Sequence, residues 1–453
     1  MKNIRYVLAA ATFGLASTAI AQNLQSGYFT EGYLYRHDLN PAIGNEKNYV
    51  SMPGLGNVNV GMTGNLRTDA ILYNVNGRTA LFLNPNVSTN EVLSNIKNKN
   101  KLSENLRLQI LGAGFKAFGG YNTIEINARQ SLDIIVPGDI FRLAKEGMEN
   151  KTYDMGGLKA NVVGYAELAL GHSHKIDDKL TVGAKVKFLF GIANIDAKVN
   201  KAQLTLAQDS WTGVTNAEIN ASIKNMTYKI EQKDRGPEGE KTTHRYVSGV
   251  DDSDWGVNGF GLAADLGAVY KYDNNWTFSA SLLDLGFIGW NTNYTASTNG
   301  DRSINTDNYN FNSFDNEMDR LTEGLASLYE LQDNGDKGSR TKALAATMNL
   351  GVEYTPDFYD KMKFGFMNST RMAGSYSYTD FRLSASVAPC KIFSASTNMG
   401  LGTYGASFGW LLDFHPTGFN FYLGMDHTLG KIAKQGLPLS GRANVNIGMN
   451  VPF

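Results

Sequence analysis

The sequence predicts an all-β fold: an antiparallel transmembrane β-barrel of about 14 strands with an N-terminal plug segment and a few short loop helices. Three observations predict it: an N-terminal export signal, long segments of alternating apolar and polar residues, and charges confined to the polar face of those segments. Apolar residues make up 42% of the chain, and 42 basic residues nearly balance 43 acidic ones. The charge balance argues against a nucleic-acid binder, and the single Cys390 excludes an intramolecular disulfide framework.

The N-terminus has the features of a cleaved export signal. Lys2 and Arg5 precede a run of mostly small or apolar residues that ends at Ile20. A small-x-small pattern follows, which predicts cleavage between Ala21 and Gln22 and removal of residues 1–21. The run is shorter than the roughly 20 apolar residues of a spanning helix, which disfavours a membrane anchor. We therefore expect the mature chain in the outer membrane, surrounded by its lipid.

The mature chain contains a series of segments that read as β-strands between two environments. Successive side chains of a strand point to opposite faces, so alternation gives each segment one apolar and one polar face. The longer segments span about 10 to 17 residues, whereas soluble strands average about 5 or 6. The segments are Ile124–Ile134, Leu158–Leu170, Leu180–Ile192, Phe260–Tyr272, Leu344–Tyr354, Phe381–Val387, Phe393–Met399, Tyr404–Phe414, Phe419–Met425 and Ala443–Phe453.

The charged residues of these segments fall on the polar face. We expect Glu125, Arg129, Glu167, Lys185 and Lys187 to face the lumen and to line a path through it. A lipid-facing Lys or Arg costs roughly 2 to 4 kcal/mol at the bilayer midplane. The cost of several such residues would exceed the free energy of unfolding of a typical protein, which is roughly 5 to 15 kcal/mol. A soluble β-sandwich also alternates, but here the apolar faces carry aromatic residues near their ends. They are Tyr272, Trp276, Trp290, Tyr354, Tyr404, Phe414 and Phe453.

One segment breaks the alternation. Continuing the parity of Trp276 would point Asp284 towards lipid. A β-bulge near residues 282–283 would change the parity, and Leu283, Leu285 and Phe287 would then continue the apolar face.

Short and long connections alternate, as expected when one end of a barrel faces the periplasm and the other the outside. About 13 strands follow residue 105, and an even total requires one more, which we place within residues 57–83. The sequence thus suggests a plug or periplasmic segment at 22–56 and a barrel at 57–453. Its longer links are at about 136–157, 197–255, 291–341 and 428–440.

Three segments between the strands carry helical signals. Ser88 with Glu91 forms a capping-box pattern, Asp139 precedes an apolar turn, and residues 318–329 follow helical spacing. We interpret them as loop helices at the barrel mouth or, alternatively, as a gate or docking surface. Residues 227–232 suggest a hairpin beyond the membrane.

No pattern of catalytic or metal-binding residues stands out. His172 and His174 share a strand face and could chelate a metal, but their position near a turn favours solvated side chains. Residues 333–336 match a calcium loop only in part. No order of residues singles out a nucleophile with its base. We expect no enzyme activity, no cofactor and no bound metal.

The last strand alternates up to Phe453. This pattern resembles the C-terminal signal by which the barrel-assembly machinery recognises outer-membrane proteins. The resemblance implies that Phe453 serves in assembly and that this machinery is a partner.

Two further resemblances concern the family. Asn40, Pro41 and Ala42 follow a Tyr-rich stretch and look like the Asn-Pro-Ala signature of the long-chain fatty-acid transporter superfamily and of related barrels of the type IX secretion system. Met52–Gly56, Gly114–Lys116, Pro137–Asn150, Glu167–Gly171 and Gly183–Ile192 resemble a large domain-of-unknown-function family of Gram-negative outer-membrane barrels. The resemblance implies a 14-strand transporter-like barrel with a tucked-in plug. It brings no substrate and no catalytic residues.

Three functions remain open at this point. The first is a passive channel for small amphipathic or hydrophobic molecules, with the inward charges along the path. The second is a structural or assembly barrel whose long loops dock a protein of a secretion or surface machine. The third, an outer-membrane enzyme, is the least favoured. Ion conductance or solute uptake would distinguish the channel from the scaffold.

Overall fold

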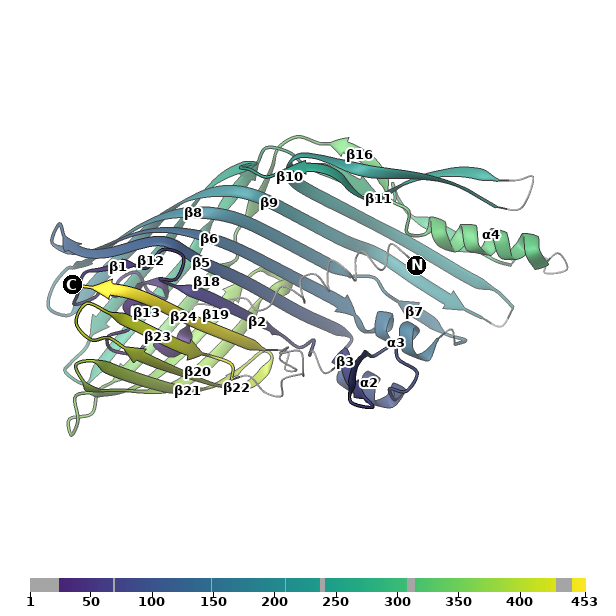
Figure 1. Cartoon of the computed structure of the whole chain (residues 1–453). Helices are drawn as coiled ribbons and strands as arrows, with labels where there is room; N and C mark the ends of the chain where they lie inside the picture. Colours follow the sequence, from purple (N-terminus) through teal and green to yellow (C-terminus); the bar gives the residue numbers. More distant parts are fainter. Residues whose placement is uncertain are drawn as a thin grey trace.

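The computed structural model is a closed barrel of 14 antiparallel strands (Figure 1). It describes residues 24–67, 70–147, 149–207, 209–236, 241–307, 314–428 and 442–453. The predicted signal segment with its cleavage point at Ala21 and Gln22, and most of the link at 428–440, lie outside these residues. None of the described helices is long and apolar enough to cross a membrane.

The wall follows the chain order almost throughout, since each strand pairs with the next wall strand. The first stave consists of β1 (Tyr49–Ser51) and β2 (Val58–Gly64), which both pair with the last strand and with β5, closing the barrel. The other staves are β5 (Lys99–Ala117), β6 (Gly120–Pro137), β8 (Lys159–Lys175), β9 (Leu180–Leu206), β12 (Gly259–Lys271), β13 (Trp276–Trp290), β17 with β18 (Arg340–Ala343 and Ala346–Tyr354), β19 (Met362–Met372), β20 (Tyr378–Cys390), β21 (Phe393–Gly402), β22 (Gly405–Phe414), β23 (Asn420–Met425) and β24 (Ala443–Pro452).

The first stave corrects the boundary that the sequence suggested at residue 56. The wall already begins at Tyr49, which lies opposite Pro452 of β24 and Gly114 of β5. The stave is interrupted between Ser51 and Val58, where the chain turns through Gly54 at a positive φ of 70°. Alternation over three residues is too short to identify β1 from sequence.

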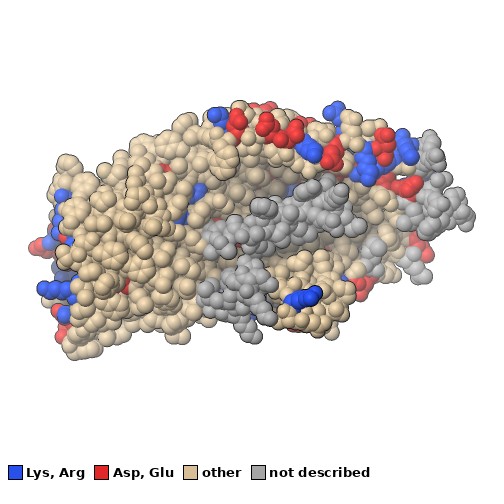
Figure 2. All heavy atoms as spheres, viewed as in Figure 1, with Lys and Arg blue, Asp and Glu red and all other residues tan. Residues whose placement is uncertain are grey.

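The two faces of the wall differ as the alternation predicted. Outward side chains such as Phe260, Leu383 and Met399 are exposed hydrophobic residues, whereas inward ones such as Glu167 and Asp413 are buried polar residues. Figure 2 shows charged side chains gathered at one end of the barrel and along the opposite extension, with a broad band of other residues between. The band fits the hydrocarbon layer of a membrane.

The parity change in β13 occurs at Leu283 and Asp284. The register of β12 and β13 shifts here, Asp284 has a positive φ of 57°, and its backbone N–H donates to Asp265 Oδ1. Leu285 and Phe287 then face outward, as predicted. The prediction was wrong for Leu283, which is buried, because the bulge lies one residue later than expected. Beyond it, Trp290 also points inward, so this residue does not belong to the outer aromatic set.

A strand extension continues the wall beyond the barrel (Figure 1). The second half of β9 leaves β12 and pairs with β10 (Trp211–Arg235), whose far half forms a hairpin with β11 (Thr242–Asp254). Three short strands and a helix complete the extension: β14 (Tyr294–Ser297), β15 (Arg302–Asn305), β16 (Gln332–Asp336) and α4 (Phe314–Ser327). The predicted hairpin and the third predicted helix are therefore present.

The other two predicted helices are α2 (Thr89–Asn95) and α3 (Gly138–Glu146), beside β3 (Leu72–Val75), β4 (Arg78–Leu81) and β7 (Thr152–Asp154). Strands β3 and β4 form a separate hairpin. Phe82, Val92 and Phe141 pack together, which holds α2 and α3 at the same end of the barrel as the extension. Ser88 is the N-cap of α2 but makes no side-chain capping bond, so the predicted capping box does not form.

A charged clasp holds α4 to the β10–β11 hairpin. Both ring nitrogens of His244 face carboxylates, Nδ1 at 2.9 Å from Glu330 and Nε2 at 3.0 Å from Glu323 of α4. Arg235 also pairs with Glu330. Burial alone would lower the pKa of His244, but the hydrogen bonds to Glu330 and Glu323 outweigh it and raise that pKa above its ordinary value.

The clasp predicts a pH-dependent α4. A raised pKa means that the imidazolium contributes stability in full below the ordinary pKa and loses it as pH rises through the raised pKa. Amide hydrogen exchange of residues 319–327, corrected for intrinsic rates, should therefore be faster at about pH 9 than at about pH 6. The His244→Gln variant should lose this difference, whereas His174→Gln, at an exposed position near the other end, should keep it. Equal exchange at both pH values in the unmodified protein would contradict the clasp.

Candidate functional site

The candidate site lies in the lumen, where the N-terminal segment meets the inner wall. We call residues 24–48 the plug. It contains two short 3-10 helices, η1 (Gln25–Gly27) and η2 (Leu34–Asp38), and most of its side chains up to Ala42 are buried. It hydrogen-bonds to strands on all sides of the barrel, from β5 through β13 to β24. The plug therefore fills the lumen at this level.

The beginning of the plug is held by Asp426, which follows β23. The backbone N–H groups of Gln25 and Ser26 each donate to this carboxylate at 2.7 Å. On the other side, Arg382 of β20 donates to the Gln25 side chain and, at 2.8 Å, to Asn398 of β21. Two charged wall residues thus bind η1 through directional bonds.

The Asn40-Pro41-Ala42 motif fits against β9, β12 and β13. Asn40 Nδ2 donates at 3.2 Å to the backbone oxygens of Ala268 and Ala280, which face each other across the β12–β13 pair. A side chain at Gly267 or Gly183 would overlap Asn40 or the carbonyl of Pro41. The two glycines allow the close approach, and the motif fixes the plug to the wall.

A buried ion-pair cluster joins the centre of the plug to β5, β6 and β9. Asp38 lies between Arg107 and Lys185, with Nη1 of Arg107 at 2.6 Å and Nζ of Lys185 at 2.9 Å. Both cations also contact Glu125 Oε2, each at 3.1 Å. Two carboxylates therefore balance two cations in a place from which water is excluded. We call these four residues the latch.

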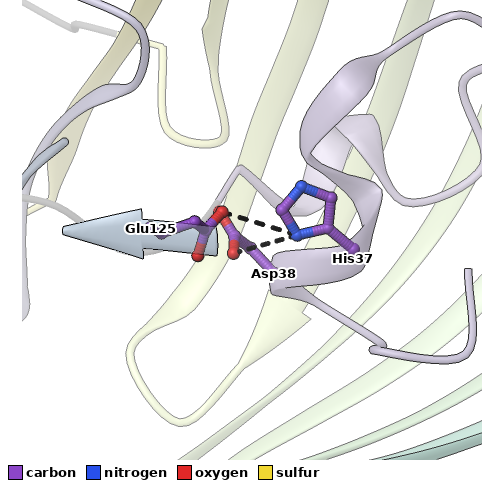
Figure 3. A group of neighbouring side chains, drawn as sticks. All are labelled: His37, Asp38 and Glu125. Carbon is purple, nitrogen blue, oxygen red and sulfur yellow. Dashed lines mark ion pairs between the residues drawn. The ribbon is translucent and has the colours of Figure 1, made fainter. Parts of the chain in front are cut away.

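His37 lies beside the latch (Figure 3). Its Nδ1 is 3.4 Å from Asp38 Oδ1 and 3.7 Å from Glu125 Oε1, and a ligand atom from each of the three residues lies within 4.8 Å of the other two. That spacing could hold a metal ion. However, the Lys185 ammonium lies 3.3 Å from the same Nδ1 and bonds both carboxylates. A cation of the protein itself therefore already neutralises Asp38 and Glu125 at this place. The other ring nitrogen, Nε2, lies 3.0 Å from the Tyr49 hydroxyl.

A second ion-pair cluster lies further along β6, β8 and β9. Arg129 binds both oxygens of Asp284, at 2.9 and 3.0 Å, and contacts Glu167 at 3.2 Å. Lys187 lies 2.6 Å from Asp284 and 2.7 Å from Asp265. Two cations therefore meet three carboxylates. The bulge in β13 is what turns Asp284 inward to join them.

Beyond the plug, on the side of the extension, the lumen opens into a cavity of about 500 Å³. We call it the upper cavity. Its floor includes Gln25 and Leu39 of the plug, and its walls include Trp290, Asn349 and Lys159. The volume lies within the roughly 300 to 1,000 Å³ of small-molecule sites.

Contacts across the lumen cover part of the upper cavity. Arg371 of β19 forms a bidentate pair with Asp133 of β6, at 2.9 and 3.0 Å, although these strands lie on nearly opposite sides of the barrel. The short helix η5 (Gly374–Tyr376) follows β19, and Ser375 accepts hydrogen bonds from Lys101 and Lys159 of the far wall. The β19–β20 connection thus bridges the mouth.

A smaller cavity of about 190 Å³ lies on the opposite side of the plug. Tyr28, Phe29 and Ile43 of the plug line it, together with Val269 and Glu353 near the short turns. We call it the lower cavity. The plug separates the two cavities.

All five predicted path residues face the lumen, and they fall into the two clusters. Glu125 and Lys185 are buried in the latch, and Arg129, Glu167 and Lys187 belong to the second cluster. Only Arg129 lines the upper cavity. Phe453 lies at the end of β24, where its N–H donates to Asn48.

Four residues of the clusters were not among the predicted path residues: Asp38, Arg107, Asp265 and Asp284. Asp38 lies two positions before the Asn40 motif, which pointed to the plug but not to its charge. Arg107 lies in a predicted strand without having been selected, and Asp284 was recognised only as a break in the alternation. The signal that could have found them is the rule that every buried charge needs a counter-charge.

The sequence matches the model of a family described as a family of unknown function, DUF5723, over residues 41–426. The match covers most of the chain. The protein belongs to this family. The match begins within the Asn40-Pro41-Ala42 motif and includes both ion-pair clusters except for Asp38 of the latch. No curated protein matches the sequence of this DUF5723 member.

Among solved structures, two described as toluene transporters and one described as a FadL homologue show distant similarity to this DUF5723 barrel. The toluene transporter TbuX of Ralstonia pickettii is 10% identical, with a TM-score of 0.39 over 92% of this chain and 93% of that chain. The toluene transporter TodX of Pseudomonas putida is 8% identical, with a TM-score of 0.38 over 96% and 94%. A FadL homologue of Pseudomonas aeruginosa is 11% identical, with a TM-score of 0.38 over 96% and 99%.

The latch predicts that Asp38 is needed to hold the plug. Asp38→Asn should lower the free energy of unfolding by about 3 to 5 kcal/mol, because the two buried cations would then share the single carboxylate of Glu125. It should also expose residues 24–48 to protease. Urea unfolding of the protein in lipid vesicles and limited proteolysis would measure both effects.

The matched control is Asp178→Asn. Asp178 is fully exposed in a turn and pairs with the exposed Lys175, so its loss should leave the free energy of unfolding nearly unchanged. If the two variants unfold and are cleaved alike, the latch does not hold the plug.

Proposed function

We propose that this protein is a passive conduit for small amphipathic molecules across the outer membrane, and that displacement of the plug opens it. The observation that carries the proposal is the arrangement of two cavities on the two sides of one plug. Both cavities are lined in part by the plug. Leu39 lines the upper cavity, and Ile43 lines the lower cavity. Displacement of the plug would join the two cavities into a path.

The lining supports solutes with both apolar and polar parts. Leu283, Ile288 and Trp290 give the upper cavity an apolar wall, and Arg129 and Asp133 give it charged groups. A mixed lining of this kind is usual for small-molecule sites, where the apolar surface binds the ligand and a few polar groups orient it.

Solute flux through reconstituted vesicles tests the proposal. A variant that combines Gly183→Ala with Gly267→Ala would push the wall against Pro41 and Asn40 and so disfavour the seated plug. Overpacking costs about 1 to 3 kcal/mol, so the open fraction should rise roughly 5- to 150-fold. The measurement is the entry of radiolabelled benzoate and arabinose into vesicles, compared with the unmodified protein.

The control is Gly249→Ala in β11, where an added Cβ would meet open space. It should leave the flux unchanged. If neither the unmodified protein nor the double variant conducts ions or solutes, and a fixed protein partner co-purifies, the barrel is a scaffold rather than a conduit.

A further inference from the structure

Three lysines lie in one row on the inner wall at the mouth of the upper cavity. Lys101 of β5 and Lys159 of β8 lie on the two sides of Ile135 of β6, each directly opposite it. Lys159 in turn lies opposite Lys198 of β9, and both of these lysines line the cavity. Like charges that face each other on neighbouring strands repel. The row therefore needs anionic partners.

The carboxylates of the protein neutralise one of the three lysines. Lys198 pairs with Glu218 at 2.7 Å. Among the residues that the structure describes, no carboxylate lies within ion-pair distance of Lys101 or Lys159. The carboxylates that line the cavity have cations of their own, in the pairs Asp133–Arg371, Asp196–Lys342 and Asp284–Arg129. Two ammonium groups of the row thus remain without a counter-charge from these residues.

Both of these ammonium groups bind Ser375, which lies in the connection that bridges the mouth. We call residues 373–377 the strap. Lys101 Nζ donates to the backbone oxygen of Ser375 at 2.6 Å, and Lys159 Nζ donates to its Oγ at 3.3 Å. No residue of η5 is buried, so the strap is not held by a packed core. Because both ammonium groups contact atoms of one serine, an anion in the place of Ser375 can reach both.

The two acceptors of Ser375 are uncharged, whereas an anionic acceptor forms the stronger bond with an ammonium group. A phosphate monoester carries a charge of about −1.5 to −2 at pH 7 and three acceptor oxygens. One such group therefore matches the two unneutralised ammonium groups in both charge and number of bonds. A carboxylate carries a single charge and would neutralise only one of them.

We propose that the phosphate group of a small organic phosphate binds between Lys101 and Lys159 in the place of Ser375. Loss of the two lysine bonds releases the strap from the far wall and opens the mouth to the solute. The organic part of the solute then extends past Asn161, the next inward residue of β8, into the upper cavity. This proposal rests on the proposed conduit function, for which it names the class of solute and the step of entry.

Equilibrium dialysis of the purified full-length mature protein in detergent tests the site, with phenyl phosphate as the probe at about pH 8. Lys101→Gln and Lys159→Gln should each weaken binding about tenfold to a hundredfold, because each removes one charge-assisted hydrogen bond. Ser375→Ala should instead tighten binding roughly twofold to tenfold, because it removes an acceptor that competes for Lys159. The opposite sign separates displacement of Ser375 from simple attraction to lysines.

Amide hydrogen exchange of Tyr376 and Ser377 tests the release of the strap. Their N–H groups donate to Ala373 and Gly374 within the strap. Bound phenyl phosphate should speed this exchange in the unmodified protein, since the strap then loses its two bonds to the far wall. A bound ligand usually slows exchange near its site, so the faster exchange is specific to displacement. Unchanged or slower exchange at saturating phenyl phosphate would overturn the proposal.

The matched control is Lys175→Gln, which changes an exposed turn residue. It should bind phenyl phosphate as the unmodified protein does. Circular dichroism and heat-modified gel mobility would show that the other variants still form the barrel. Equal binding of phenyl phosphate by Lys101→Gln, Lys159→Gln and the unmodified protein would overturn the proposal.

Benzoate and inorganic phosphate serve as comparison ligands, because benzoate has the ring with a single charge and inorganic phosphate has the charge without the ring. Binding of either as tight as that of phenyl phosphate would overturn the assignment of an organic phosphate. Binding of phenyl phosphate without its flux into vesicles would leave the site intact and reject the conduit. Flux of arabinose without binding of phenyl phosphate would do the reverse.

Discussion

The exclusion of ionised groups from hydrocarbon is the constraint on which the rest of this structure depends. It places the charges in the central parts of the barrel strands on the inner side of the wall, where water is scarce and each charge needs a partner. The latch and the second cluster are the result. The arrangement of charged side chains in the lumen thus follows from the need to neutralise the charges of the wall, independently of any solute.

The plug takes part in this neutralisation. Within the latch, the wall supplies Arg107, Lys185 and Glu125, so the wall alone carries one excess positive charge. Asp38 of the plug removes that excess. Seating the plug is therefore an electrostatic requirement of the closed state as well as a packing event. Displacing it has to expose Arg107 and Lys185 to water or to another anion.

The sequence predicted what depends on local alternation and missed what depends on contacts across the lumen. Strand positions, the inward charges and the three loop helices follow from periodicity over a few residues. The pairs Asp38–Arg107 and Asp133–Arg371 join residues 69 and 238 positions apart, and nothing local marks them as partners. Leu283 and Trp290 were misplaced for a related reason, because one bulge residue reverses the parity of all that follows.

The plug is held at three separate places in the barrel. Asp426 binds η1, Asp38 belongs to the latch, and Asn40 bonds the backbone of β12 and β13. A hydrogen-bonded network of this kind resists rearrangement. Because the three contacts involve different strands, breaking one of them leaves the other two in place. Displacement of the plug therefore requires that several contacts be lost together.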